Sequence, residues 1–389
     1  MISVAEALHA LFALVAPLET EEVPLSEAKG RVLARDVAAR RDQPPFPASA
    51  MDGYAVAGDP ASGDTFDVIG EAAAGHGFAG QIGPGQAVRI FTGAPVPEGA
   101  TRILIQEDVT RDGTTITLGD APDTARHIRP AGTDFATGTV LTAPRRLRPA
   151  DIALLAAMNV ARVPVTREPV VAILPTGDEL VQPGEDPGPD QIVASNSYGL
   201  HAALRDAGAR PRLLPIARDT VPSLQTALGL AGDADLIVTI GGASVGDHDL
   251  VATAAESLGL SRSFYKVAMR PGKPLMAGRI GSATLIGLPG NPVSAMVCGA
   301  IFLRPVVDVL LGLPARPANQ QTARLATPLP ANGPREHYMR ARTGPDGVNA
   351  FDRQDSSLLT VLSAADCLLV RPPHDPARPA GETVETVPL

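Results

Sequence analysis

The sequence predicts a multidomain protein with a central α/β domain, whose sheet is mostly parallel, and with separate β-rich domains. Three observations favour this fold class. The chain of 389 residues is longer than one hydrophobic core usually serves. Residues 169–313 alternate between apolar strand-like runs and helical segments, as βαβ units do. The flanking segments instead carry many Gly and Pro residues and short β-like runs.

The first 168 residues are expected to form two domains. Residues 1–44 and 140–168 contain helical patterns, and we expect them to form one elongated helical arm. Ser3 and Glu6 fit a capping box at the start of the first helix. Residues 45–139 between these segments predict an inserted β-rich domain, with a hairpin in “RILIQEDVTRDGTTITL” that turns at an Asp-Gly pair.

The remaining residues predict the α/β domain and a further β domain. In residues 169–313 the runs “PVVAIL”, “RLLPI”, “DLIVTI” and “ATLIGL” read as strands, each followed by a loop and a helical segment. The last of these helices is expected to start after Asn291, with Pro292 at its first position. Residues 314–389 return to short β-like pieces, which predict a small C-terminal β-barrel.

Composition and charge exclude several functional classes. Apolar residues make up 44% of the chain and charged residues 19%, which suits several packed cores and not a disordered protein. With 33 basic and 42 acidic residues the net charge is −9, so no nucleic-acid surface is expected. The longest apolar run, from Pro292 to Arg304, is too short to cross a bilayer. We therefore expect no contact with a membrane. Cys298 and Cys367 follow no CxxC pattern and predict no disulfide framework, which fits a cytoplasmic protein.

An anion-binding site is expected at the carboxyl ends of the strands, where open α/β sheets bind ligands. Two of the loops there, “GGASVGDHD” and “PGNP”, are rich in glycine, and the second opens a helix. Glycine turns and helix starts present N–H groups to anions, although such turns also occur simply as strand-to-helix junctions. The segment “YKVAMRPGKP” adds basic side chains. The predicted binding residues are Gly241, Gly242, Ser244, Gly246, Lys266, Arg270, Lys273, Gly290 and Asn291.

Carboxylates follow the same strands and require an explanation, because they would repel an anion. They are Asp178, Glu179, Asp219, Asp247 and Asp249. A Mg²⁺ ion resolves this, since it accepts one or two carboxylates together with phosphate oxygens. Clustered acids also raise one another's pKa, so one of them could hold a proton and act as a general acid. A further acid, Asp52 in “FPASAMDGYAV”, has a local explanation as part of an Asp-Gly turn.

Six motifs in one order cover the whole chain: “SAMDGYAV”, “FTGAPVP”, “PTGDEL”, “GGASVGDHD”, “RPGKP” and “GLPGNPVSA”. Together they resemble the MoeA family, the molybdopterin molybdenumtransferases. The resemblance implies a homodimer of four-domain subunits with a MogA/MoaB-like α/β domain. It also implies the last step of molybdenum cofactor synthesis, in which molybdate and adenylylated molybdopterin react with the help of Mg²⁺ and AMP leaves. Transient contacts with molybdopterin adenylyltransferase and acceptor molybdoenzymes would follow.

The resemblance also implies roles for individual residues. The residues matched to catalytic positions are Asp52, Thr92, Glu179 and Asp249, with Glu179, Asp219 and Asp249 as metal ligands. Lys266, Lys273, Pro289 and Pro292 match pocket residues. In a family-like dimer the inserted domain of one subunit faces the α/β domain of the other, which would place Asp52 at that cleft. We expect Asp52 or Glu179 to donate protons, while the roles of Arg129 and Asp134 in “IRPAGTD” stay open.

Three other functions are weighed against this one. A molybdopterin adenylyltransferase resembles the α/β domain, but that family is expected to carry Gly-Gly-Thr-Gly where this chain has “GGASVG”. A non-catalytic molybdopterin-binding scaffold is less well supported, because the acids at the strand ends are retained. A preference for tungstate over molybdate is left open by the sequence.

Overall fold

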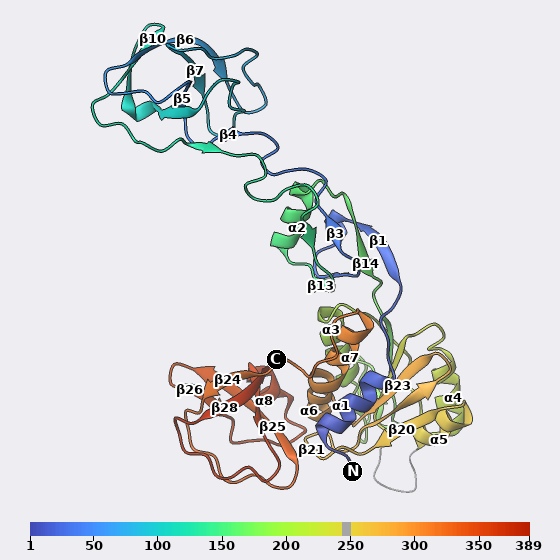
Figure 1. Cartoon of the computed structure of the whole chain (residues 1–389). Coiled ribbons are helices and arrows are strands. Elements are labelled where there is room, and N and C mark those ends of the chain that lie inside the picture. Colours follow the sequence, from blue (N-terminus) through green and yellow to red (C-terminus); the bar gives the residue numbers. More distant parts are fainter. Residues whose placement is uncertain (243–249) are drawn as a thin grey trace. The chain divides into compact units, whose positions relative to one another are not determined.

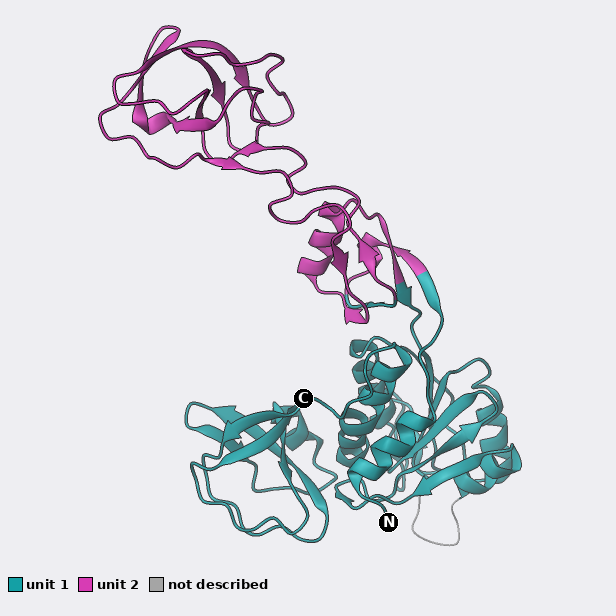
Figure 2. Cartoon of the chain, in the orientation of Figure 1, with its two compact units in different colours: residues 1–21, 30–34, 165–389 teal, residues 22–29, 35–164 magenta. Residues whose placement is uncertain are grey.

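The computed structural model describes residues 1–242 and 250–389, and it divides into two compact units (Figures 1 and 2). The first unit contains the α/β domain and the C-terminal β domain, and the second contains the β-rich insertion and a helical segment. The first unit comprises Met1–Glu21, Gly30–Ala34 and Val165–Leu389, and the second comprises Glu22–Lys29 and Arg35–Pro164. The short strands at the passages between them are β1 (Thr20–Pro24), β2 (Val32–Leu33) and β14 (Arg162–Thr166).

The main sheet of the second unit has both faces covered. Its six strands lie in the order β8-β5-β7-β6-β10-β9. Alternate residues of β5 enter different cores, Tyr54 and Val56 on one side and Ala55 on the other. The predicted Asp-Gly turn is confirmed, since it joins β9 to β10 at Gly113, which has φ 58°. The start of the predicted first arm instead forms β8, which pairs with β5. The strands are β5 (Gly53–Val56), β6 (Thr65–Ala72), β7 (Gln86–Ile90), β8 (Arg102–Ile105), β9 (Val109–Asp112) and β10 (Thr115–Leu118).

The rest of the second unit consists of short elements and one helix, α2. Asp151 in the first turn of this helix is buried, and it accepts a hydrogen bond from the Arg148 N–H at 2.9 Å. The elements are η1 (Leu25–Glu27), β3 (Val37–Ala38), β4 (Ala48–Ser49), η2 (Gln106–Asp108), β11 (Ile128–Arg129), β12 (Val140–Leu141), β13 (Arg145–Arg146) and α2 (Pro149–Ala157).

In the first unit a six-stranded sheet of order β18-β15-β19-β23-β22-β20 forms the α/β domain. Its first four strands are parallel, as predicted. Strand β22 runs antiparallel to β23, and β20 runs antiparallel to β22. Alternate residues of β15 face opposite helical layers: Ile173 packs with α3, α6 and α7, and Ala172 packs with α4 and α5. The strands are β15 (Val170–Pro175), β18 (Arg210–Leu213), β19 (Leu236–Ile240), β20 (Ser261–Tyr265), β22 (Met276–Ile280) and β23 (Ala283–Leu288).

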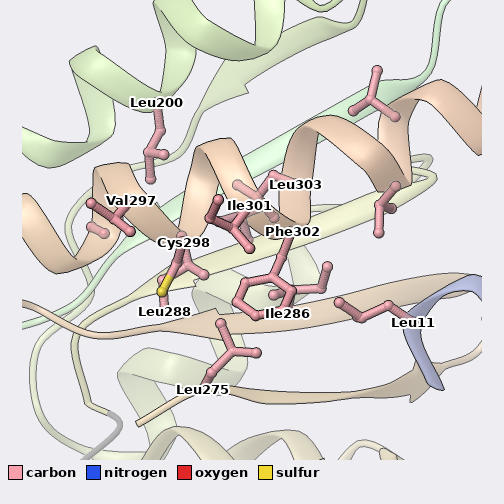
Figure 3. Close-up of a cluster of buried hydrophobic side chains, with 14 of the residues drawn as sticks. Leu11, Leu200, Leu275, Ile286, Leu288, Val297, Cys298, Ile301, Phe302 and Leu303 are labelled. Atoms are coloured by element: carbon pink, nitrogen blue, oxygen red, sulfur yellow. The ribbon is translucent and has the colours of Figure 1, made fainter. Parts of the chain in front are cut away.

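The helices of the α/β domain include one continuous run at the centre of the core. From Pro292 to Leu310 the chain is helical over 19 residues, with a π-helical turn in the middle. The expectation that this apolar run is too short to cross a bilayer is wrong, because the helix continues beyond Arg304 and is long and apolar enough by itself, but most of it is buried inside the protein as a core helix. Figure 3 shows Cys298 and Phe302 pointing from this helix toward the strands. The helices are α3 (Asn196–Asp206), α4 (Val221–Gly229), α5 (Leu250–Ser257), α6 (Pro292–Cys298), η3 (Gly299–Leu303) and α7 (Arg304–Leu310).

The first helix, α1 (Val4–Ala13), packs on the α/β domain, whereas the sequence predicts residues 1–44 in the helical arm. Its buried residues Leu8 and Leu11 share a core with the α/β helices and strands. The N-terminus is also held by the main chain, because Ile2 forms a β-bridge with Val267. The predicted capping box of Ser3 is confirmed.

The C-terminal β domain is joined to the α/β domain by a strand pair. The two-residue strand β21 (Met269–Arg270) lies in the α/β segment and pairs in parallel with β25 of the C-terminal domain. The resulting sheet has the order β21-β25-β27-β28-β24, with β26 beside β25. Its other elements are β24 (Gln321–Arg324), β25 (Glu336–Gly344), β26 (Gly347–Ala350), α8 (Leu359–Ala364), β27 (Cys367–Arg371) and β28 (Thr383–Pro388).

Candidate active site

A pocket of about 570 Å³ lies at the carboxyl ends of the parallel strands in the first unit. Its lining comes from the residues after β15, β19 and β23, from the start of α3, and from the short parallel pair β16 (Leu180–Val181) and β17 (Ile192–Val193). Eight of the predicted site residues line it: Glu179, Asp219, Gly241, Gly242, Pro289, Gly290, Asn291 and Pro292. The pocket therefore lies where the strand topology predicts a ligand site.

Glycines allow the strand ends to approach one another at the pocket floor. A Cβ atom on Gly241 would lie 2.6 Å from the carbonyl oxygen of Thr176, and a Cβ atom on Gly290 would lie 3.5 Å from the Gly241 Cα. Gly242 has φ 68°, and a Cβ atom there would lie 2.2 Å from Cγ2 of Val251. At Gly241 no side chain fits against the main chain that follows β15, so the two strand ends pack directly against each other, whereas the contact at Gly290 is an ordinary van der Waals one.

The two described carboxylates of the pocket come from neighbouring loops. Glu179 lies over Gly177, where a Cβ atom would be 2.4 Å from the carboxylate Oε2. The loop of Asp219 is tied to the Glu179 loop through Asp178, whose Oδ1 accepts the Asp219 N–H at 3.2 Å and whose carbonyl accepts Arg218 Nη1 at 2.8 Å. Two exposed carboxylates are thus held on one pocket wall.

This donor set is compatible with Mg²⁺, which takes one or two carboxylates and completes its shell with phosphate oxygens and water. The third predicted ligand, Asp249, lies outside the described residues, as do Ser244 and Gly246. Within residues 1–242 and 250–389, no three His, Cys, Asp or Glu side chains are grouped closely enough to form a metal site by themselves. A cation bound here would therefore depend on the ligand for part of its coordination.

Two helix starts border the pocket and are linked to each other. The side-chain amide of Asn196, at the start of α3, donates to the Gly290 carbonyl at 2.7 Å. Asn291 is the N-cap residue of α6, as predicted, but its side chain makes no capping hydrogen bond. The N–H of Val293 instead donates to the Ser356 carbonyl at 3.0 Å, which ties this helix start to the C-terminal domain.

The predicted basic residues lie beside the pocket lining and not on it. Lys266 has φ 71°, an unusual value for a residue with a side chain, and its Nζ lies 4.7 Å from the centre of the Tyr265 ring. Arg270 and Lys273 are exposed, and the next residue, Pro274, does line the pocket. The basic segment therefore reaches the pocket edge through its last residue.

A cluster of basic side chains from the C-terminal domain was not predicted from the sequence. Ser357 lines the pocket, and two residues before it the Asp355 carbonyl accepts Arg340 Nη2 at 3.1 Å. Arg340 is fully buried, and its Nε and Nη1 have no hydrogen-bond partner among the described residues. Burial, followed by the charge of Arg270, lowers the pKa of Arg340 to about 10.

His337 belongs to the same cluster. Its side chain is 7% exposed, and its Nε2 has no hydrogen-bond partner in the part of the chain that the structure describes. Burial and the charges of nearby arginines, Arg270 first among them, lower the pKa of His337 to about 4. The imidazole is therefore neutral near pH 7. The sequence carries no local motif for this cluster, because β21 and β25 meet only in the folded sheet.

Asp52 and Thr92 lie together in the second unit, at the ends of β5 and β7. The N–H and the hydroxyl of Thr92 donate to Asp52 Oδ1 at 2.7 and 2.8 Å. These two hydrogen bonds, and the charge of Arg89, hold the pKa of Asp52 below its usual value. The carboxylate is therefore ionised at neutral pH in this unit. The open residues Arg129 and Asp134 are exposed on this unit.

The fold and the pocket define an α/β protein with a pocket at the carboxyl ends of its parallel strands, where proteins of this class bind ligands. Comparison with known proteins gives the family. Three family models match: the MoeA N-terminal region (domain I and II) over residues 2–159, a probable molybdopterin binding domain over 172–309, and the MoeA C-terminal region (domain IV) over 322–389. The chain belongs to the MoeA family.

Individual relatives agree with this assignment. Molybdopterin molybdenumtransferase 2 of Mycobacterium tuberculosis is 39% identical over 332 residues, which cover 82% of each chain. The molybdopterin molybdenumtransferase of Haemophilus influenzae is 34% identical and covers 96% of this chain and 95% of its own. A crystal structure of the molybdopterin biosynthesis MoeA protein from Pyrococcus horikoshii OT3 matches all of both chains with a TM-score of 0.87 and 26% identity.

The ionisation of Asp52 gives a direct test of this geometry. Thr92→Val removes the hydroxyl donor and keeps the side-chain shape, so the pKa of Asp52 should rise toward its usual value while remaining below it. The measurement is a titration of the aspartate carboxyl carbons by NMR. Because the folded-state pKa is the lower one, the pair's contribution to stability is present above the unfolded-state pKa and is lost as pH falls through the folded-state pKa.

Thr137→Val is the matched control. Thr137 donates its N–H and hydroxyl to Asp42 Oδ1 at 2.6 and 2.8 Å, the same arrangement elsewhere in this unit. The control should raise the pKa of Asp42 and leave that of Asp52 unchanged. An Asp52 titration that does not respond to Thr92→Val would contradict the assigned cause of the shift.

Proposed function

We propose that this chain is a molybdopterin molybdenumtransferase. Adenylylated molybdopterin and molybdate enter, molybdenum becomes bound to the dithiolene sulfurs, and AMP leaves, which completes molybdenum cofactor synthesis. One observation carries the proposal: a single pocket combines glycine-lined strand ends and a helix start, which suit a phosphate group, with Glu179 and Asp219, which suit a cation. The names of the curated relatives support the same activity.

In this proposal the phosphate groups bind at the pocket floor. The main chains of Gly241 and Gly242 and the start of α6 would supply N–H donors and partial positive charge. Lys266, Lys273 and Arg270 would add charge from the neighbouring segment. Ser244 and Gly246 follow the same glycine pair in sequence and belong to the same predicted site.

Glu179 and Asp219 are the residues that would hold Mg²⁺, together with Asp249 as predicted from the sequence. When bound, the ion would polarise the phosphoanhydride of the adenylate and neutralise the charge that develops on AMP. The loop hydrogen bonds of Asp178 would fix the spacing of the two carboxylates.

Molybdate needs a site of its own, because it is a second anion beside the phosphates. We propose that this site lies at the cluster of Arg340, Arg270 and Ser357. The buried guanidinium of Arg340 has two nitrogens without hydrogen-bond partners among the described residues, which suits an oxyanion acceptor. Tungstate has the same charge and shape, so the two oxyanions would compete there.

The proton transfers can be assigned in part. Molybdate loses oxo groups as sulfur binds, and these oxygens must take up protons. The ionised carboxylate of Asp52 suits a base that accepts a proton from a substrate thiol and passes it to a departing oxygen. Glu179, as a proposed Mg²⁺ ligand, would stay ionised and would not be the donor. The Thr92 hydrogen bonds would hold the Asp52 carboxylate in place.

Asp52 and the pocket belong to different units of the chain. We propose a homodimer in which the Asp52–Thr92 pair of one subunit meets the pocket of a partner subunit. A cytoplasmic location fits the substrates. Transient contacts with the adenylyltransferase that supplies the substrate, and with acceptor molybdoenzymes, would pass on reactive intermediates.

The decisive experiment is AMP release from purified adenylylated molybdopterin in the presence of Mg²⁺, with and without molybdate. We expect AMP release that depends on molybdate and yields metal-loaded cofactor. Binding of the adenylate without AMP release would instead indicate a scaffold. Formation of the adenylate from ATP and molybdopterin would indicate the adenylyltransferase.

Gly177→Ala tests the placement of Glu179. The added Cβ would collide with the Glu179 carboxylate, so the Mg²⁺ concentration for half-maximal AMP release should rise about 10-fold, as expected for a disturbed ligand shell. Gly184→Ala is the control, because Gly184 also has a positive φ, 95°, and a Cβ there meets no atom within 4 Å. Equal effects of the two substitutions would attribute the change to backbone strain and remove Glu179 from the metal site.

Arg340→Met tests the molybdate site. Loss of the buried guanidinium should raise the KM for molybdate by about 10-fold or more, the usual cost of a hydrogen bond to a charged group, and leave binding of the adenylate unchanged. Arg342→Met, an exposed position on the same strand, should leave both constants unchanged. An Arg340→Met variant with an unchanged KM for molybdate would exclude this site.

A further inference from the structure

We propose that Arg89 is the positioning residue of Asp52: it fixes the main chain on which the Asp52 carboxylate is carried. This inference rests on the proposed role of Asp52 in the reaction. Arg89 lies on β7, three residues before Thr92, and its side chain is half-buried. In the sheet register it stands opposite Tyr54 of β5, two residues after Asp52.

The guanidinium of Arg89 is held by two aromatic rings. Its Cζ lies 4.9 Å from the centre of the Tyr54 ring and 4.9 Å from the centre of the Phe91 ring. Tyr54 is itself buried in the core of the unit, so its ring has a fixed place. Cation–π contacts of this kind gain strength where water is partly excluded. These ring contacts therefore hold the guanidinium in place independently of its hydrogen bonds.

From this anchored position Arg89 reaches the main chain at Asp52 by two routes. Its Nη1 donates to the carbonyl of Gly53 at 3.4 Å, and its Nη2 donates to the side-chain oxygen of Gln106 at 2.7 Å. The N–H of Gln106 in turn donates to the carbonyl of Asp52 at 3.1 Å. Two consecutive carbonyl groups are thus connected to one guanidinium, directly and through Gln106.

The same strand end also holds the carboxylate. Thr92 binds Asp52 Oδ1 through two hydrogen bonds, and Phe91 lies between Thr92 and Arg89 in sequence. Both the side chain and the main chain of Asp52 are therefore fixed by residues 89–92. Two other charged residues lie nearby in the sheet: Glu71 is the register partner of Arg89 on β6, and Glu107 accepts the Gln106 amide at 3.1 Å.

This arrangement requires arginine and not merely a positive charge. The planar guanidinium can contact aromatic faces while two of its nitrogens donate in different directions. A lysine at this position would keep the charge near Asp52 and lose the double connection. The two properties of Arg89, charge and position, can therefore be separated by substitution.

The experiment combines Arg89→Met, Arg89→Lys and Asp52→Asn with their double variant. Arg89→Met should lower the kcat of molybdate-dependent AMP release by about 10- to 100-fold, the effect of a small misplacement of a reacting group, with little change in KM. The variant Asp52→Asn with Arg89→Met should be no slower than Asp52→Asn alone. Arg89→Lys should lower kcat while the NMR titration still shows a low pKa for Asp52.

Arg111→Met on the β9–β10 hairpin is the matched control. Arg111 donates to the nearby Gly113 carbonyl at 2.9 Å, so its loss should leave kcat unchanged. Additive losses in the double variant would overturn the proposal, as would an unchanged kcat in Arg89→Met. Full activity of Asp52→Asn would instead be a failure of the proposed function. In that case the Asp52 carboxyl signal in Arg89→Lys decides, because this variant keeps the charge and loses the double connection: the signal should shift, and an unshifted signal overturns the positioning role.

Discussion

The close approach of three strand ends is the constraint on which the pocket depends. A side chain on Gly241 would collide with the main chain at Thr176, and one on Gly242 would collide with Val251 of α5. With no side chains between them, main-chain groups form the floor of the pocket, and polar side chains such as Glu179 and Asp219 are left to its walls. The helical layers below hold this arrangement, since the strands that end here are buried on both faces.

In the second unit, a few residues at the ends of two strands hold the exposed carboxylate of Asp52. Asp52 is exposed at the end of β5, and the sheet that carries it is covered on both faces. Thr92 holds the carboxylate of Asp52, and Arg89 holds the main chain below it. The Asp42–Thr137 pair shows that the same two hydrogen bonds also serve a joint between loops, so the bonds alone do not identify a functional acid.

Much of the site could be predicted because parallel strands end at one edge. Reading the residues after each apolar run located Glu179, Asp219 and the glycine loops. The place of α1 could not be predicted this way. Periodicity indicates that Leu8 and Leu11 are buried, but it does not indicate which domain they pack against. Arg340 and Ser357 depend on the pairing of β21 with β25, which has no local signal. The lowered pKa of Asp52 depends on Thr92, forty residues further along.

The pairing of β21 with β25 also bears on how the pocket is made during synthesis. A ribosome releases residues 169–313 before Ser357, yet Ser357 forms part of the pocket wall, and the Ser356 carbonyl binds the start of α6. The α/β domain can therefore emerge with its sheet complete and its ligand site still open on one side. In such a nascent chain the substrate pocket would lack the wall that contains Ser357 until β25 has paired with β21.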